Sequence, residues 1–432
     1  MIIIKEICYN PRKTGKLLVR NGRIIDPANN IDKIGDIFLE NGIISAIGEN
    51  LAATEGTEEI DAFGYWVVPG LIDLHVHFRE PGFEHKEDLK SGSFAAALGG
   101  FTTVCAMANT KPVIDSADWI KYILEQSAKI GGTKIMPIGA VTQNLGGERL
   151  ADLEGMAKAG ACGFSDDGFS VRNAELFREA LRIAKKLNLP IFSHCEDLNL
   201  GNSPKSESNF VERDIALAKE IGAHLHICHV SVTESLDYIQ KAKKEGVKIT
   251  AEVCPHHFAL NSENIPKDIG NRANFKMSPP LRSREDMLAV QTALTHGIID
   301  AIATDHAPHS VGEKASGYEN APNGVIGLET AVAVSITNLV QPGLITPLQL
   351  INHMSTIPAR ILGISDRGRL SVGSAADIAI IDAATPYTVN SSGFASKARN
   401  TPFEGQQVVG KIIYTILDGR IIVKNGKLFD VD

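Results

Sequence analysis

The chain has 432 residues, of which 44% are hydrophobic and 22% charged, a composition that is typical of a globular protein and excludes a disordered or collagen-like chain. The formal net charge is −8 and no run is rich in lysine or arginine, which argues against a protein that binds nucleic acid. Six cysteines without a C-x-x-C pair indicate a reducing compartment rather than a disulfide scaffold.

Both ends of the chain are predicted to form short strands joined by tight turns. Near the start, Asn21-Gly22 and Asn41-Gly42 stand between short apolar segments, and near the end Asp418-Gly419 and Asn425-Gly426 do the same. These dipeptides are strong hairpin signals because both turn residues adopt positive φ. We therefore predict one small β-sandwich domain that is built from residues 1–66 and 366–432.

The middle of the chain alternates apolar, β-branched runs with amphipathic helical patterns such as Ala174–Leu187. Buried parallel strands have this composition, so the pattern predicts a parallel sheet covered on both faces. Eight repeats favour closure of residues 67–365 into a (β/α)8 barrel; an open doubly wound sheet is the alternative, but no G-x-G-x-x-G follows the first strand. The eight runs are Val67–Val76, Thr102–Ala106, Lys134–Ala140, Ala161–Ser165, Pro190–His194, Ala223–Val230, Val247–Val253 and Asp300–Ala303.

Nearly every predicted strand ends in side chains that bind metals or form ion pairs. In a barrel the carboxyl ends of the strands open onto one face, so these side chains would converge. Imidazoles and carboxylates without a thiolate suit a catalytic divalent metal, zinc first, and six such donors favour two metals that share a bridge. An isolated H-x-H pair is a weak signal, because two structural histidines produce it more often than a pair of metal ligands does. The residues are His75, His77, Arg79, Asn109, Asp166, Asp167, His194, His229, Asp305 and His309.

Six segments carry a family resemblance. Together they are similar to the amidohydrolase superfamily and, within it, to the class I bacterial dihydroorotases. The resemblance spans almost the whole chain, and its most specific parts are H-x-H-x-R-E-P-G and T-D-H-A-P-H. The segments are Val68–Gly82, Ala108–Pro112, Gly163–Gly168, His226–Ser231, Pro255–His257 and Ala303–His309.

This resemblance implies the zinc-dependent, reversible cyclisation of N-carbamoyl-L-aspartate to L-dihydroorotate in pyrimidine biosynthesis. It implies two zinc ions per chain, bridged by Asp167 and a hydroxide, with the other ligands His75, His77, Asp305, His194 and His229. Strand alternation lets only one of Asp166 and Asp167 point inward; the motif favours Asp167, but the residues alone do not decide. Asp305 is the expected catalytic residue, which moves a proton from the attacking hydroxide to the leaving nitrogen.

The resemblance also implies a set of substrate contacts. The planar guanidinium of Arg79 suits the carboxylate of dihydroorotate. Ser278 stands where the family segment K-x-N-P-P-L-R has asparagine, so we expect a weaker or water-mediated contact there. The stretch Ser310–Pro322 is either an active-site lid or an ordinary barrel loop. The expected contacts are His77, Arg79, Asn109, Ser278, His309, Asn323 and Gly324.

Other functions stay open at this point. An allantoinase, a dihydropyrimidinase or a hydantoinase would share the barrel, although Arg79 and the two adjacent aspartates argue against the last two. An inactive scaffold homologue is disfavoured because all four histidines and both aspartates are present. We expect a small-molecule substrate, a homodimer, possible association with aspartate transcarbamoylase, and no nucleic acid or membrane. The apolar stretch Met1–Lys5 is too short for a signal peptide, which favours a cytoplasmic protein.

Overall fold

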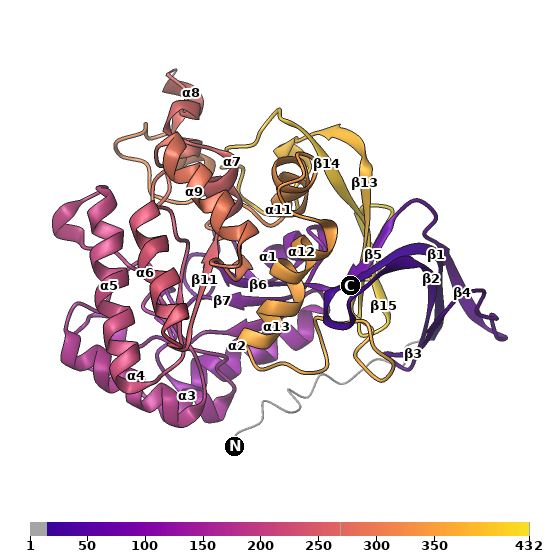
Figure 1. Ribbon diagram of the computed structural model, residues 1–432, viewed down its shortest axis with the longest axis horizontal. Helices are drawn as coiled ribbons and strands as arrows, with labels where there is room; N and C mark the ends of the chain where they lie inside the picture. The colour runs from indigo at the N-terminus through magenta and orange to yellow at the C-terminus, as the bar shows by residue number, and fades with distance from the viewer. Residues whose placement is uncertain (1–14, 268, 432) are drawn as a thin grey trace.

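The structure is a computed structural model that describes residues 15–267 and 269–431, so the stretch Met1–Lys5 lies outside the described residues. A barrel surrounded by helices forms one side of the molecule and a large sheet forms the other (Figure 1). Within the described ranges, no helix is both long and apolar enough to cross a membrane.

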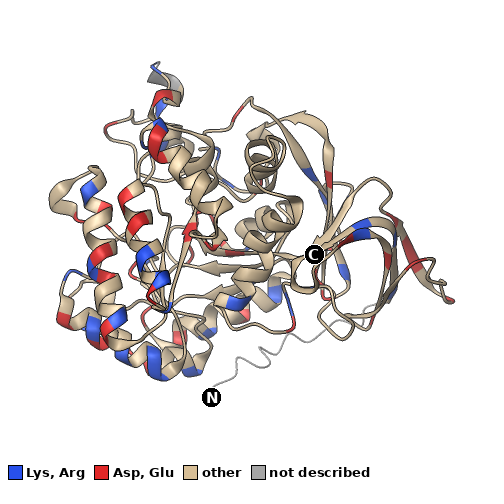
Figure 2. Cartoon of the chain, in the orientation of Figure 1, with Lys and Arg blue, Asp and Glu red and all other residues tan. Residues whose placement is uncertain are grey.

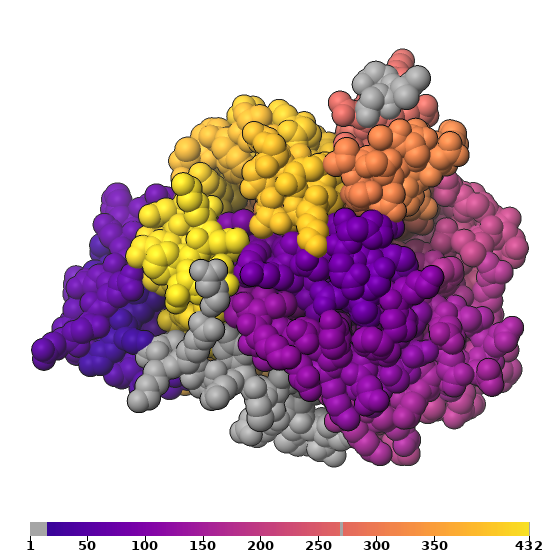
Figure 3. Space-filling model, turned by 180° about the vertical axis from the view of Figure 1, so that it is seen from behind, coloured from indigo at the N-terminus to yellow at the C-terminus, as the bar shows by residue number. Residues whose placement is uncertain are grey.

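The two ends of the chain form one nine-stranded sheet. Its order is β16-β15-β14-β13-β5-β1-β2-β3, with β4 paired to β1. β5 pairs with β1 and with β13, which joins the two halves, and Figure 3 shows the indigo and yellow segments packed together at one end of the molecule. The strands are β1 (Lys16–Asp26), β2 (Ile31–Glu40), β3 (Ile43–Gly48), β4 (Thr57–Asp61), β5 (Trp66–Pro69), β13 (Ile378–Thr388), β14 (Gln407–Leu417), β15 (Arg420–Lys424) and β16 (Lys427–Leu428).

One of the four predicted hairpin turns is wrong. Asn21-Gly22 lies inside β1, where the register against β2 shifts between Val19 and Gly22 as in a β-bulge. The Asn21 backbone N–H donates to Asp36 Oδ1 at 2.9 Å, and a Cβ at Gly22 would lie only 2.2 Å from Val67 Cγ2. The other three turns are confirmed, with both residues at positive φ between antiparallel strands: Asn41-Gly42, Asp418-Gly419 and Asn425-Gly426.

Eight parallel positions close the barrel, and the predicted fold class is confirmed. Strand pairing runs β6-β7-β8 and β9-β10-β11-β12. Phe164 bridges the two groups by pairing with Gly139 and Ile191, and a bridge between Val76 and His306 completes the circle. The strands are β6 (Leu71–Val76), β7 (Phe101–Ala106), β8 (Lys134–Pro137), β9 (Ile191–Ser193), β10 (Leu225–Ile227), β11 (Ile249–Val253) and β12 (Ala301–Ile302).

Helices cover the barrel between these strands. The predicted helix Ala174–Leu187 matches α4 at both ends, because Phe177, Ala180, Leu181 and Ala184 are buried at helical spacing. Figure 2 shows basic and acidic residues interspersed over the outer helices. The helices are α1 (Leu89–Leu98), α2 (Ala117–Ile130), α3 (Leu153–Ala159), α4 (Ala174–Leu187), α5 (Pro204–Ile221), α6 (Thr233–Lys244), α7 (Pro255–Ala259), α8 (Ile269–Arg272), α9 (Arg284–Thr295), α10 (Val311–Lys314), α11 (Ala331–Ser335), α12 (Pro347–Ile351) and α13 (Ile357–Ile361).

The apolar run Val67–Val76, predicted as one strand, is two strands in different sheets. β5 belongs to the nine-stranded sheet and β6 to the barrel, and the chain changes sheet at Gly70. A Cβ at Gly70 would lie 2.2 Å from Thr102 Oγ1, so glycine is needed where the backbone passes β7. Apolar composition could not reveal the change because both strands are buried along their length. The domain limits at residues 66 and 365 stay a prediction.

A partly buried carboxylate, Glu329, ties the barrel to the connection that precedes β14. It accepts hydrogen bonds from the backbone N–H groups of Ala395 at 2.9 Å and Ser396 at 3.3 Å. Burial raises the pKa of Glu329 from its ordinary value of 4.5 to about 8. The folded protein therefore binds a proton here more tightly than the unfolded chain does.

Glu329→Gln is expected to flatten the pH dependence of the melting temperature. Because the folded pKa is the higher one, stability from this group is fully present below about pH 4.5 and is lost as the pH rises through about 8. The uncharged amide removes that loss, so the variant melts above the parent protein at about pH 9. Thermal unfolding measured between these pH values checks the prediction. Glu404→Gln is the control, because Glu404 is another carboxylate that accepts a backbone N–H, from Ser391. Parallel curves for parent and Glu329→Gln would contradict it.

Candidate active site

The six predicted metal ligands meet at one end of the barrel. Each lies at or just after the carboxyl end of a strand position, which is the face where the barrel connections converge. All six side chains are buried: His75, His77, Asp167, His194, His229 and Asp305.

The Asp167 carboxylate lies at the centre of this cluster. Its Oδ2 atom is 3.2 Å from His77 Nε2. Burial alone would raise the pKa of Asp167, but the imidazoles that face it outweigh burial and hold this pKa well below its ordinary value. The Asp167 carboxylate is therefore ionised. It also contacts all four histidines. Its Oδ1 atom is 3.3 Å from His75 Nε2, 3.4 Å from His194 Nδ1 and 3.5 Å from His229 Nε2.

Asp166, the alternative considered from the sequence, points away from the cluster. Its Oδ1 atom accepts hydrogen bonds from the backbone N–H groups of Val141 and Thr142 at 2.8 and 2.9 Å, and the Thr142 hydroxyl donates to Oδ2. Neighbouring residues of an extended segment face opposite sides, so only Asp167 can face the imidazoles.

Asp305 completes the cluster. It directly precedes His306, which pairs with Val76 where the barrel closes. The Asp305 Oδ1 atom is 3.1 Å from His77 Nε2 and 3.6 Å from His75 Nε2. Burial opposes ionisation of Asp305, but the charges and hydrogen bonds of these two histidines lower its pKa far below the ordinary value. Asp305 is thus an ionised carboxylate directed at the centre.

The backbone is left-handed at three residues of this region. The φ angles are 63° at Arg79, 36° at His229 and 45° at Asp305. A residue with a Cβ pays a steric penalty of about 1–2 kcal/mol in this conformation. Each of these three residues stands where the chain leaves a barrel strand, and the left-handed turn there directs its side chain toward the barrel axis.

The donor set fits a divalent metal. His75 Nε2 and Asp167 Oδ1 are buried without a hydrogen-bond partner among the described residues, and such atoms are costly unless something else binds them. Two overlapping groups, His75–His77–Asp167 and Asp167–His194–His229, have ligand atoms within 4.8 Å of one another. Imidazole nitrogens and carboxylate oxygens are donors that zinc accepts in catalytic sites.

Three of the four imidazoles are held at the nitrogen that faces away from the centre. Such contacts fix the tautomer and the ring orientation of a metal ligand. Asn109, expected as a substrate contact, contacts His77 in this way. Glu196 and Glu252 were missed by the sequence reasoning; the only signal for Glu252 is a carboxylate inside a buried apolar strand. The distances are 2.7 Å from His75 Nδ1 to Glu252 Oε1, 2.8 Å from His77 Nδ1 to Asn109 Oδ1, and 2.9 Å from His194 Nε2 to Glu196 Oε2.

Arg79 and His309 lie together beside the cluster. Arg79 Nε donates to the Pro308 carbonyl at 3.2 Å, and its Nη2 atom lies 3.4 Å from His309 Nε2. Burial lowers the pKa of Arg79 to about 10, so the group is still a cation at neutral pH. Burial and the charges of Arg79 and Lys86 lower the pKa of His309 to about 3, which leaves a neutral imidazole. No carboxylate of the described residues hydrogen-bonds to Arg79, so its charge is available to an anion.

Asn400 holds the same side of the site together. Its amide donates to the carbonyls of Ala307 at 3.2 Å and Gly324 at 3.0 Å, and its oxygen accepts the His309 backbone N–H at 3.3 Å. His309 Nε2 in turn donates to the Asn323 carbonyl at 2.8 Å. Gly324 has φ of 138°, and a Cβ there would lie 2.7 Å from the Ala307 carbonyl oxygen. The predicted contacts Asn323 and Gly324 are thus packed against His309.

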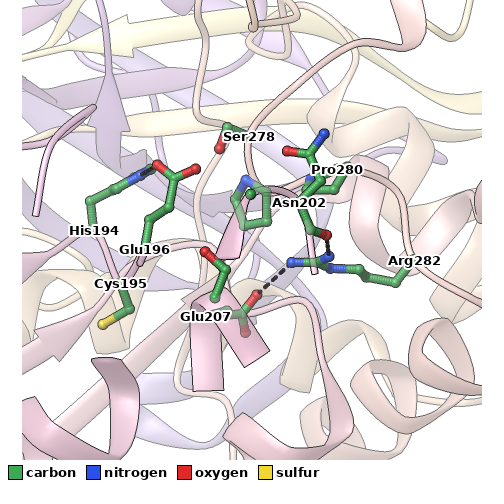
Figure 4. Close-up of a pocket in the computed structure, with 11 residues that line it drawn as sticks. His194, Cys195, Glu196, Asn202, Glu207, Ser278, Pro280 and Arg282 are labelled. Atoms are coloured by element: carbon green, nitrogen blue, oxygen red, sulfur yellow. Dashed lines mark hydrogen bonds and ion pairs between the residues drawn. The ribbon is translucent and has the colours of Figure 1, made fainter. Parts of the chain in front are cut away.

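Ser278 lines a small pocket beside the cluster. His194 and Glu196 line the same pocket, together with Asn202, Glu207 and Arg282 (Figure 4). Arg282 is already engaged, because it donates to the Asn202 carbonyl and lies 3.7 Å from Glu207 Oε2. The hydroxyl of Ser278 hydrogen-bonds to Glu196, so within this pocket it faces a carboxylate.

The stretch Ser310–Pro322 is tied to its surroundings. Lys314 Nζ donates to the carbonyls of Ala273 at 3.0 Å, Lys276 at 3.2 Å and Pro322 at 2.9 Å. These contacts hold α10 against the segment that leads to Ser278. A lid role for this stretch stays a prediction.

The chain after Arg79 packs closely against the loop that follows β7. Gly82 has φ of 97°, and a Cβ there would lie 1.9 Å from the Lys111 carbonyl oxygen. We expect Gly82→Ala to lower the free energy of unfolding by about 1–3 kcal/mol and to reduce turnover, because the segment that carries Arg79 must move. Thermal unfolding and steady-state kinetics measure both effects.

Gly64→Ala is the matched control for Gly82→Ala. Gly64 has φ of 82° but nothing within 4 Å of a Cβ, so the control carries the torsional cost without the clash. Equal losses of stability in the two variants would show that the contact with Lys111 is unimportant.

The chain is similar to known proteins over almost its full length. The model of the amidohydrolase family matches residues 66–422. A curated dihydroorotase of Geobacter metallireducens is 43% identical over 426 residues, which cover 94% of this chain and 99% of the relative. A dihydroorotase of Pelotomaculum thermopropionicum is 45% identical over 428 residues, with 95% and 99% covered.

Solved structures show the same architecture. The L-hydantoinase (dihydropyrimidinase) from Arthrobacter aurescens superposes with a TM-score of 0.85 at 26% identity, covering 96% of this chain and 97% of that one. The dihydropyrimidinase from Brevibacillus agri has a TM-score of 0.84 at 25% identity, with 96% of both chains covered.

Proposed function

Because the chain belongs to the amidohydrolase family, we propose that it has dihydroorotase activity, opening L-dihydroorotate to N-carbamoyl-L-aspartate and closing it again in pyrimidine biosynthesis. The curated relatives named dihydroorotase are 43% and 45% identical and are covered over 99% of their length. The observation that carries the proposal is Arg79, a cation beside the metal-ligand cluster that donates to the Pro308 carbonyl and lies against the neutral His309 ring, with no carboxylate of the described residues hydrogen-bonded to it. Dihydroorotate has a ring carboxylate that hydantoin and dihydrouracil lack, and a guanidinium binds a carboxylate in a bidentate manner.

We propose that two zinc ions bind at the cluster and share Asp167. His75, His77 and Asp305 would hold one ion, and His194 and His229 the other. The two overlapping donor groups support this arrangement. When bound, such ions polarise a carbonyl and make water a stronger nucleophile at neutral pH.

Asp305 is the proposed proton carrier. Its ionised carboxylate, 3.1 Å from His77 Nε2, is directed at the cluster, where a ring amide would lie. As water attacks the amide carbon, Asp305 takes a proton from it and gives a proton to the ring nitrogen when the carbon–nitrogen bond breaks. In the closing direction Asp305 takes a proton from the ureido nitrogen and returns it to the departing water.

The proposed binding residues orient the substrate. Arg79 would bind the ring carboxylate, and His309, held by the Asn323 carbonyl, would present its uncharged ring to the same side. Asn109 and Gly324 would contact the substrate from the edges of the site, and the Ser278 hydroxyl would make a longer contact than an asparagine does. These roles rest on the family resemblance together with the positions described above.

We also propose that the protein is a cytoplasmic homodimer that can associate with aspartate transcarbamoylase. This part rests on the family resemblance alone. Light scattering on the purified protein, with and without the transcarbamoylase, tests it, and a monomer that does not bind the transcarbamoylase would contradict it.

The first experiment is turnover by the zinc-loaded protein of L-dihydroorotate, dihydrouracil, hydantoin and allantoin, together with a metal count. Selective turnover of dihydroorotate with about two metals per chain is the expected result. Opening of dihydrouracil or hydantoin would indicate a dihydropyrimidinase or hydantoinase, and opening of allantoin an allantoinase. Bound metal without turnover of any ring would favour an inactive scaffold homologue.

A further inference from the structure

A line of hydrogen-bonding side chains runs from the metal-ligand cluster into the barrel. Glu252 on β11 lies between two imidazoles, with Oε1 2.7 Å from His75 Nδ1 and Oε2 3.0 Å from His226 Nε2. His226 Nδ1 is 2.8 Å from the Thr250 hydroxyl, which lies 3.0 Å from His224 Nε2. Glu252, His75 and His226 have no exposed surface, so these contacts lie away from bulk solvent.

The chemistry of these groups fixes where the protons are. A carboxylate only accepts, so both imidazoles donate to Glu252, His75 through Nδ1 and His226 through Nε2. In a neutral imidazole the other nitrogen then has a free lone pair. For His226 this lone pair accepts from the Thr250 hydroxyl, whose oxygen accepts from His224.

In the neutral, metal-binding form of His75 the free lone pair would be on Nε2. This nitrogen faces Asp167 Oδ1 at 3.3 Å and has no hydrogen-bond partner among the described residues. An unprotonated nitrogen is the form of histidine that binds a metal. Glu252 therefore holds His75 in the one tautomer that can act as a ligand.

A purely structural role explains Glu252 poorly. Its neighbours on β11, Ala251 and Val253, are buried and apolar, and an apolar side chain at position 252 would avoid the cost of desolvating a carboxylate. Asn109 accepts the hydrogen bond from His77 Nδ1 with a neutral amide oxygen. A negative charge is therefore not required merely to accept one hydrogen bond from an imidazole. A charged partner strengthens the hydrogen bond and makes the imidazole a better donor to a metal.

We propose that Glu252 is a positioning residue of the metal centre, and that His226 and Thr250 orient Glu252 from the interior of the barrel. This inference rests on the proposed metal-dependent function. It predicts that metal affinity depends on residues that contact neither metal nor substrate.

Glu252→Gln tests the proposal at nearly constant shape. The amide has one accepting oxygen and one donating NH₂ group, so it cannot accept from both imidazoles. We expect the zinc dissociation constant to rise about 10- to 100-fold, the range found for such partners of metal ligands. Competition with a chelator measures it without substrate, and the absorption spectrum of the cobalt-loaded protein reports the changed ligand geometry.

Asp26→Asn is the matched control. Asp26, the last residue of β1, is also a fully buried strand carboxylate, but it accepts the backbone N–H groups of Ala28 and Leu370, both at 3.1 Å, far along the chain from the metal ligands. The control is expected to melt at a lower temperature while its zinc affinity and cobalt spectrum stay those of the parent protein. A Glu252→Gln protein that binds zinc as tightly as the parent, or that loses no more affinity than the control, overturns the proposal.

A second variant, Thr250→Val, keeps the test decisive if Glu252→Gln does not fold. It removes only the hydroxyl that orients His226, so a smaller loss of zinc affinity is expected, and an unchanged affinity counts against the proposal. Since zinc binding is measured without substrate, these results are separate from the turnover assay. Failure of the parent to open dihydroorotate would refute the proposed substrate and would not alter the zinc affinities.

Discussion

Turnover of dihydroorotate is expected to fall by about 10²- to 10⁴-fold when Asp305 is replaced by asparagine, the range typical of a lost general acid–base group. The amide cannot take a proton from water and return it to nitrogen, although it keeps the size of the carboxylate. The four histidines are expected to keep their positions around Asp167, so the fold and most of the bound metal should remain. Measurement of kcat and of metal content on the same preparation checks both parts.

Asp166→Asn is the control for this variant. Asp166 is also a buried aspartate at a strand end, but its oxygens are directed at Val141 and Thr142. We expect Asp166→Asn to lower stability and to keep most of the turnover. Substantial residual activity in Asp305→Asn, with metal bound, would remove Asp305 as the proton carrier.

The second large effect is expected at Arg79. Arg79→Met removes the cation proposed to bind the ring carboxylate, and loss of one partner of a buried charged pair costs about 2–5 kcal/mol. On dihydroorotate, kcat/KM is therefore expected to fall by about 30- to 4,000-fold. Arg79→Lys keeps the charge without the planar fork and should recover only part of the loss.

Two controls separate charge recognition from damage to the loop. Lys86→Met removes a neighbouring cation that already pairs with Glu313 at 2.7 Å, so a smaller effect is expected. Any slow turnover of hydantoin by the parent protein should be unchanged in Arg79→Met. An equal loss on hydantoin and on dihydroorotate would contradict carboxylate recognition and point to a displaced loop.

Much of the site could be predicted because strand ends in a closed barrel converge whatever their separation in sequence. His75, His194, His229 and Asp305 each follow an apolar run, and closure of the barrel brings them together. The choice between Asp166 and Asp167 could not be made, because alternation shows that one points inward but not which one. That choice depends on the backbone N–H groups of the neighbouring loop, which bind Asp166.

Residues that act through long-range contacts could not be predicted. Asn400 lies in the connection between β13 and β14, and its side chain hydrogen-bonds to the backbone of His309, about ninety residues earlier in the chain. Glu252 is a single polar residue in an apolar strand, and its two imidazole partners come from β6 and β10. No spacing along the sequence relates either residue to the site.

Two local features were predicted wrongly from the sequence, the start of α5 and the turn at Asn21-Gly22, and each has a physical reason. The amphipathic pattern in the sequence predicts a helix only over Asp214–Ile221, whereas α5 begins at Pro204. Its first turns are rich in serine and charged residues and lack an apolar stripe, so they carry no such pattern. The Asn21-Gly22 signal indicated a left-handed residue correctly, since Asn21 has φ of 59°. A bulge and a hairpin both accept such a residue, so only the pairing with β2 could distinguish them.

The left-handed backbone at Arg79, His229 and Asp305 opposes stability to activity, because the residue that fits the backbone best is not the residue that the proposed chemistry uses. Glycine at any of these positions would relieve a torsional cost of about 1–2 kcal/mol, and it would also delete a side chain that we propose takes part in the reaction. Selection for heat resistance alone would therefore reward the loss of chemistry at these positions. Thermostable descendants that remain active have to gain their stability elsewhere, in the helices and the nine-stranded sheet.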